Sequence, residues 1–221
     1  LDKKALQAGT SHNLGQNFAK AFDVKFQTED NNEEYVWATS WGISTRLIGA
    51  VILAHGDKNG LRIPPKIAPI QVVLIPIFRD EKLKKIVEDY TNPIIKELKQ
   101  NGIRIFIDWS DSSPGFKFNE WELKGVPVRI EIGPRDVETN TVIIARRDTG
   151  EKLSSPRNNL TQSIKDVLDK IQNNLYDQAK VFRDNNTHSV NTYGEFKDII
   201  KNGGFVRCGW DGKQETELKI K

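Results

Sequence analysis

The sequence of 221 residues lacks several features that mark particular classes of protein. It contains a single cysteine, which rules out an internal disulfide and indicates a reducing compartment. It has no apolar run of about 18 residues and no recognisable signal peptide, so we expect no membrane span. Its formal net charge is only +3, which neither requires nor excludes a nucleic-acid partner.

Familiar catalytic signatures are missing too. The sequence has no Ser-His-Asp pattern, no glycine-rich phosphate loop of the GxxxxGK type and no metal-ligand spacing, and its three histidines lie far apart. Methionine is absent even from position 1, and the opening LDKKALQAGTSH has the character of the middle of a domain. We therefore expect the chain to be part of a longer protein.

What remains is an ordinary globular composition, 37% apolar and 29% charged. In the first block, residues 1–68, the apolar spacing of Leu14, Phe18, Phe22 and Phe26 predicts a helix running into a strand. Residues 34–42 predict a strand, and residues 44–55 a mostly buried helix opened by Ser44 or Thr45.

The second block begins with residues 68–77, whose continuous apolar run predicts a strand covered on both faces. A helix ending at Gly102, a strand at 103–108, a short helix closed by Gly125 and two more strands follow. This β-α-β-α-β-β order predicts an α/β fold. A long helix, Leu160–Phe182, and a small tail at 183–221 complete the chain.

Arg46 stands alone as a charge in TSWGISTRLIGA, where a predicted strand passes into a predicted helix. A helix N-terminus favours an anion, and the planar guanidinium matches phosphate oxygens. Together they would suit a triphosphate. The alternative is a solvated surface arginine.

Small and polar residues crowd QAGTSHNLGQ, at positions 7–16. Side chains such as Gln7, Thr10 and His12 can fix a ribose, an amine or a carboxylate. The same stretch can instead be a helix start, with Thr10 or Ser11 as the N-cap, and both interpretations can hold together.

A third dense patch runs from Pro114 to Asp136. Its Glu122, Arg129 and Arg135 can pair with base edges, and its aromatic residues can stack on bases. Residues 116–147 hold six Lys/Arg against five Asp/Glu, however, so there is no basic stripe. On charge alone, a solvated face is the favoured interpretation of this patch.

Long runs of the sequence resemble one family. ALQAGTSHNLGQNFAKAFDVKF, YVWATSWGISTRLIGAVILAHGD and GLRIPPKIAPIQVV closely resemble prolyl-tRNA synthetases of the archaeal/eukaryotic-like type. PGFKFNEWELKGVPVRIEIGPRD, followed by RRDTGEK, is similar to their anticodon-binding domain. The resemblance implies three parts: an α+β remnant of a class II catalytic domain with an antiparallel sheet (1–68), an α/β anticodon-binding domain (69–155) and the start of a small α/β C-terminal domain (156–221).

The resemblance also implies roles for individual residues. TSWGISTRLIG resembles class II motif 3, which makes Arg46 the catalytic arginine that holds the ATP γ-phosphate. The other implied ATP contacts are Gln7, Thr10, Ser44 and Thr45, and the implied proline pocket is His12, Ser40, Trp41 and Gly42. Glu122, Arg129 and Arg135 correspond to positions that read the two guanines of a proline anticodon.

The family's activity sets the remaining expectations. It is the ATP-dependent attachment of L-proline to tRNA(Pro), with Mg²⁺ bound to ATP, in a cytoplasmic homodimer formed through the N-terminal half. Class II motifs 1 and 2 are absent from these residues, so we expect the chain alone to be inactive. Many relatives bind zinc through four cysteines, but here Asp211 and Thr216 occupy expected cysteine positions and Cys208 is offset, so we expect no metal site.

Two other interpretations stay open. The chain could be a tRNA-binding module, derived from a synthetase but without catalysis. The intact QAGTSH run and Arg46 argue against this, because a decayed site need not keep them. A related class II synthetase for threonine, glycine or histidine is disfavoured by the TSHNLGQNF run.

Overall fold

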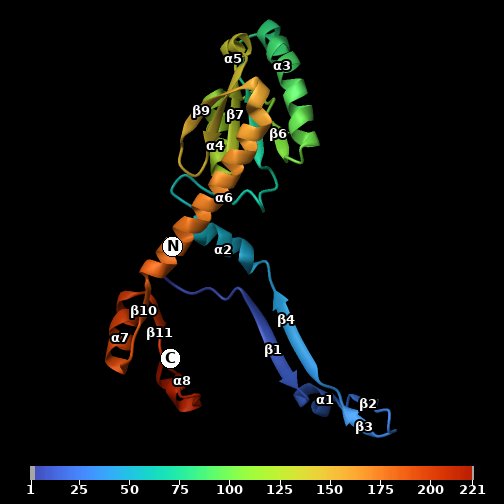
Figure 1. The fold of residues 1–221 in the computed structure, drawn as a ribbon, viewed down its shortest axis with the longest axis vertical. Helices are drawn as coiled ribbons and strands as arrows, with labels where there is room; N and C mark the ends of the chain where they lie inside the picture. Colours follow the sequence, from blue (N-terminus) through green and yellow to red (C-terminus); the bar gives the residue numbers. More distant parts are fainter. Residues whose placement is uncertain (1–2, 221) are drawn as a thin grey trace. The chain divides into compact units, whose positions relative to one another are not determined.

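The computed structural model describes residues 3–220 (Figure 1). Two compact units make up this part of the chain. The smaller runs from Ala5 to Val51, and the larger contains Lys3, Lys4 and the residues from Ile52 onward.

The smaller unit is built on a two-stranded antiparallel ladder. Strand β1, Gly9–Gly15, pairs with β4, Ala38–Ile43. Between them lie helix α1, Asn17–Phe22, and a hairpin of β2, Lys25–Gln27, and β3, Glu33–Tyr35. Within residues 5–51 the one side chain that is fully buried belongs to Ala19, so this unit has almost no core of its own.

One alternative left open by the sequence and one prediction are wrong for this unit. Thr10 and Ser11 do not start a helix but lie in β1, and α1 begins only after Gln16. The strand expected over 34–42 is interrupted, with β3 and β4 on either side of Val36 and Trp37. The polar residues of β1 are mostly exposed, so they carry no apolar alternation from which a strand could be predicted.

Helix α2, Arg46–His55, agrees with the helix predicted over 44–55. The prediction that it is mostly buried is wrong, because none of its residues is buried and Ile48 remains 65% exposed. Apolar side chains are buried only where a second surface packs on them. The residues of α2 are therefore at most half-buried.

The larger unit contains a five-stranded sheet in the order β6-β5-β7-β8-β9 (Figure 1). Strands β6, Ile105–Ile107, β5, Val72–Pro76, and β7, Val128–Ile132, are parallel. Strands β8, Thr141–Arg146, and β9, Lys152–Pro156, continue the sheet antiparallel. The predicted α/β class and the β-α-β-α-β-β order are confirmed. Strand β9 and the short helix α5, Pro134–Thr139, were not predicted.

Helices cover the two faces of this sheet differently. On one face, α3, Glu81–Gln100, and α6, Leu160–Asn185, pack on the main core, which includes Val72, Leu74 and Ile130. On the other face, α4, Pro114–Leu123, places Trp121 against Val73 and Ile75. Strand β5 is buried along its whole length, as its apolar run predicts.

After α6 the chain forms a small parallel pair, β10, Thr187–Ser189, and β11, Phe205–Arg207. Helix α7, Tyr193–Asn202, connects these strands and begins with a capping box between Thr192 and Glu195. Helix α8, Gln214–Ile220, ends the described chain. Over residues 3–220 no helix has both the length and the apolar character needed to cross a membrane.

Candidate functional sites

Arg46 lies in the first turn of α2, as the sequence suggested. Its backbone amide donates to Ser44 Oγ at 3.4 Å, and the amide of Leu47 donates to the carbonyl oxygen of Ser44 at 3.2 Å. The backbone of Arg46 is therefore held at the start of a helix, where the positive end of the peptide dipoles favours an anion.

Gln7 is brought to this arginine from 39 positions earlier in the chain. Arg46 Nη1 donates to Gln7 Oε1 at 2.9 Å. The two side chains share an open hollow of about 280 Å³, whose walls also include Thr10, Gly42 and Ser44. No carboxylate is among its lining residues, so the hollow suits an anion better than a cation. Thr45 does not line it.

The register of the β1–β4 ladder shows on which face of the ladder each of the remaining predicted residues lies. Thr10 lies opposite Gly42, and His12 lies opposite Ser40. Since residues directly opposite in a ladder share a face and alternate residues return to it, these four positions lie on one face. Trp41 lies opposite Ser11, so its side chain projects from the other face, where it is 80% exposed.

Glu122 and Arg129 come together in the larger unit. Both line a cavity of about 120 Å³, along with Trp121, Arg146 and Arg147. Arg129 Nη2 pairs with Glu131 Oε1 at 2.9 Å, and its guanidinium carbon lies 4.2 Å from the ring centre of Phe118. Lys152 Nζ lies 2.8 Å from the same Glu131 oxygen. This face of β7 to β9 is therefore charged and aromatic in character.

Arg135 lies apart from these two residues. It belongs to the N-terminal turn of α5, beyond the end of β7, and lines a different hollow of about 480 Å³ with Phe78, Arg79 and Leu83. Glu122 precedes β7 and Arg135 follows it, so the strand separates them. The position of Phe78 and Arg79 at the end of a parallel strand is a frequent place for ligands in α/β sheets, and the sequence analysis did not single them out.

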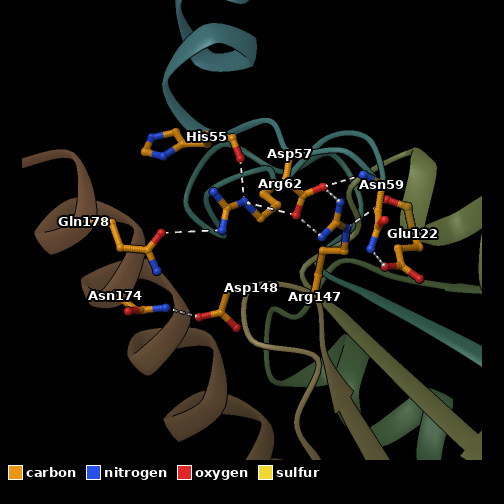
Figure 2. A network of polar contacts seen from close by, with 9 residues as sticks. All are labelled: His55, Asp57, Asn59, Arg62, Glu122, Arg147, Asp148, Asn174 and Gln178. Atoms are coloured by element: carbon orange, nitrogen blue, oxygen red, sulfur yellow. Dashed lines mark hydrogen bonds and ion pairs between the residues drawn. The ribbon is translucent and has the colours of Figure 1, made fainter. Parts of the chain in front are cut away.

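A polar network that the sequence analysis also missed connects the loop after α2 to the sheet (Figure 2). Arg147 holds Asp57 through Nη2–Oδ1 at 2.7 Å and Nη1–Oδ2 at 2.9 Å. Arg62 Nε donates to the carbonyl oxygen of His55 at 2.6 Å, and its Nη1 reaches Gln178 Oε1 at 3.4 Å. The hydrogen bond from Arg147, more than any other interaction, lowers the pKa of Asp57 to about 2.

The loop's sequence, GDKNGLRIPPK, gave only a turn signal, because Asp57 and Arg147 are 90 positions apart. The signal that could have indicated the network is the presence of two opposite charges, Asp57 and Arg62, beside glycines that allow a tight turn. Burial, first, and the charge of Arg62, second, lower the pKa of His55.

Asp211 and Thr216, two positions where relatives have cysteine zinc ligands, contact each other at the start of α8. Asp211 Oδ2 accepts from the Thr216 hydroxyl at 2.8 Å, and its Oδ1 accepts from the backbone amide of Lys213 at 3.0 Å. Cys208 is exposed. In the part of the chain that the structure describes, no group of three or more His, Cys, Asp or Glu side chains is arranged to hold a metal ion.

Comparison with known proteins finds relatives of one kind over the whole chain. Residues 71–174 match a family described as an anticodon binding domain. Over its whole length the chain is 55% identical to a proline–tRNA ligase of Chlorobium phaeobacteroides, covering 46% of that protein. It is 51% identical to one of Bacteroides fragilis and 52% identical to one of Flavobacterium psychrophilum, covering 44% and 45% of them. The chain thus spans a little under half the length of these curated relatives.

Proposed function

We propose that the full-length protein of this chain is a prolyl-tRNA synthetase that joins L-proline to tRNA(Pro), because the whole chain is 51–55% identical to proline–tRNA ligases. In the first step, the proline carboxylate attacks the α-phosphate of ATP, which forms prolyl-adenylate and releases pyrophosphate. In the second step, a ribose hydroxyl of the tRNA's 3′-terminal adenosine attacks the prolyl carbonyl and releases AMP. The protein's part is positioning and charge neutralisation.

The observation that carries this proposal is the pairing of Arg46 with Gln7 in a hollow without carboxylates. We assign the ATP γ-phosphate to Arg46, whose fork of donors matches phosphate oxygens. Gln7, Thr10 and Ser44, which line the hollow, and Thr45, which adjoins it in sequence, complete the ATP assignment. The hydrogen bond from Arg46 to Gln7 orients the guanidinium before ATP binds. The lining residues fit the anion, so Mg²⁺ would be held mainly by the phosphate oxygens themselves.

We assign the proline pocket to the adjacent ladder, with His12, Ser40 and Gly42 on one face. Thr10 lies on the same face, next to Gly42, so the amino acid and the nucleotide would meet along this face. Trp41 was assigned to the pocket as well, but its side chain projects from the opposite face, so its contribution would come from the strand's backbone.

We assign tRNA recognition to the larger unit. Glu122 and Arg129 form one subsite and Arg135 a second, since they line separate cavities. A carboxylate accepts from base amino groups and arginine donates to guanine acceptors, so this set suits guanines. The anticodon-binding-domain match over residues 71–174 supports the assignment. The divisions at 68/69 and 155/156 belong to the same proposal.

The remaining expectations are part of this proposal. They are a cytoplasmic homodimer, the archaeal/eukaryotic-like type and the absence of zinc. The last depends on Asp211 and Thr216, whose side chains are hydrogen-bonded to each other at the start of α8. We further propose that the chain alone is inactive, because class II motifs 1 and 2 are not among its residues.

Proline-dependent exchange of pyrophosphate with ATP by the full-length protein is the decisive experiment. If the proposed activity is right, pyrophosphate exchange occurs with proline and does not occur with threonine, glycine or histidine. Binding of tRNA(Pro) without any exchange would instead favour the synthetase-derived binding module, the alternative function. The observation that favours this alternative is that the larger unit, to which tRNA recognition is assigned, has a hydrophobic core of its own.

A further inference from the structure

We propose that Asn59 is a positioning residue that orients the Glu122 carboxylate for reading an anticodon base. This rests on the proposed role of Glu122 in tRNA recognition. Asn59 lies in the loop between α2 and the sheet, outside the residues that match the anticodon binding domain. The anticodon site would then include a segment that neither the family match nor the sequence resemblance assigns to it.

The direct contact is a hydrogen bond from Asn59 Nδ2 to Glu122 Oε1, at 2.9 Å (Figure 2). Glu122 is half-buried near the end of α4, beside the cavity that it shares with Arg129. A long glutamate side chain loses rotational freedom when it is fixed. An amide donor on one oxygen fixes the plane of the carboxylate and leaves Oε2 to accept from a ligand.

Asn59 is itself held in place by two layers of contacts. Its backbone amide donates to Asp57 Oδ1 at 2.9 Å, and Asp57 is held by both terminal nitrogens of Arg147. Arg147 Nε also donates to the carbonyl oxygen of Glu122 at 2.9 Å. One arginine therefore positions both partners, the loop through Asp57 and Glu122 through its backbone.

The loop backbone is also docked directly on the end of α4. The amide of Leu61 donates to the carbonyl oxygen of Leu123 at 3.0 Å, and the amide of Ile63 donates to that of Gly125 at 3.1 Å. Gly60 has a φ of +123°, and a Cβ there would lie 2.7 Å from backbone atoms of Leu123. Only glycine allows this close approach, so the position of the loop beside Glu122 is well defined.

A guanine fits this arrangement chemically. Its Watson–Crick edge presents an N1–H and an exocyclic amino group, which are both donors, and proteins read the edges of unstacked RNA bases in this way. An adenine at the same place has a ring acceptor at N1, which would face a carboxylate oxygen. The orientation of the Glu122 carboxylate therefore decides how well the two bases are distinguished.

The test measures binding of a tRNA(Pro) transcript to the chain and to its Asn59→Ala, Glu122→Ala and doubly substituted forms. Two further transcripts carry adenine in place of one or the other anticodon guanine. Asn59→Ala removes the side-chain amide and leaves the backbone bond to Asp57. Asn202→Ala is the matched control, since that exposed amide also donates at 2.9 Å, in α7. Urea midpoints of all variants report on folding.

Asn59→Ala should weaken binding of the natural transcript about three- to ten-fold, the loss of one orienting hydrogen bond. It should hardly affect binding of the transcript that lacks the guanine read by Glu122. In the Glu122→Ala background it should have no further effect, because its role is exerted through that carboxylate.

The possible failures are distinguishable. If Glu122→Ala leaves tRNA binding unchanged, the proposed role of Glu122 is wrong and the inference falls with it. If Glu122→Ala weakens binding but Asn59→Ala does not, only the positioning role is overturned. Additive losses in the double variant would also overturn it, since Asn59 would then act independently of Glu122.

Discussion

Both terminal nitrogens of Arg147 donate hydrogen bonds to the Asp57 carboxylate, at 2.7 and 2.9 Å. This pair joins the end of β8 to the loop after α2. The arginine side chain is 6% exposed and the aspartate side chain 30%. Removing one partner of such a pair leaves a nearly buried charge without its counterion. Asp57→Asn should therefore lower the free energy of unfolding by about 1–3 kcal/mol, measured by urea denaturation at pH 7.

The stability difference should also depend on pH. The pKa of Asp57 is lowered to about 2 in the folded chain, chiefly by the hydrogen bond from Arg147, against an ordinary value of 3.8. A lowered folded pKa stabilises the fold above the unfolded pKa, and this stabilisation is lost as the pH falls to the folded pKa. The gap between wild type and Asp57→Asn should thus be full above about pH 4 and close towards pH 2.

An exposed ion pair provides the control. Glu81 pairs with Lys84 at 3.2 Å, and its side chain is 86% exposed. Glu81→Gln should change the free energy of unfolding by less than about 0.5 kcal/mol at any pH in this range. A gap between wild type and Asp57→Asn that persists undiminished at pH 2 would contradict the assignment of the stabilisation to the Asp57 charge.

The sheet of the larger unit was predictable because burial leaves a pattern in the sequence. Strand β5 is buried on both faces and appears as an unbroken apolar run. Helix α6 buries one stripe, with Ile164, Leu168 and Ile171 at helical spacing. Where a segment contributes to a core, the spacing of its apolar residues along the sequence follows from the geometry of its secondary structure.

Contacts between distant polar residues could not be predicted in this way. Strand β1 could not be distinguished from a helix start, one of the two interpretations left open, because its residues are polar and mostly exposed and show no period. The bond between Asn59 and Glu122 joins positions 63 apart. Arg135 and Glu122 are close in the sequence but separated by β7. The candidate residues could be named from the sequence, but which of them lie together required the fold.

Arg46→Ala should raise the ATP concentration that the full-length protein needs for pyrophosphate exchange about 10- to 100-fold, because it removes a charge-assisted contact to the phosphates. Gln7→Ala should have a smaller effect of the same kind, since Arg46 loses its 2.9 Å orienting acceptor but keeps its charge. Lys20→Ala, in exposed α1, is the control and should leave exchange unchanged. Unchanged exchange kinetics in Arg46→Ala would defeat the phosphate assignment.

Trp121→Phe should destabilise the larger unit, because it removes the indole N–H donor and part of a buried ring. Trp121 Nε1 donates to Asp108 Oδ2 at 2.7 Å, and the two residues are only 8% and 6% exposed. Without the indole donor, a buried carboxylate oxygen loses its partner, at a cost of about 1–3 kcal/mol. Trp210→Phe, at a residue 69% exposed, should leave the urea midpoint in place. Equal midpoints for the two variants would show that the Asp108 bond contributes nothing.

Arg135→Ala should weaken tRNA binding independently of Glu122→Ala. The two residues line separate cavities on either side of β7, so they would contact different parts of the RNA. Losses at sites without shared partners add in free energy, within about 0.5 kcal/mol. The double variant should therefore bind a tRNA(Pro) transcript with the product of the two single fold-losses. A double variant no weaker than Glu122→Ala alone would mean that both residues act on one base, against their separation in the fold.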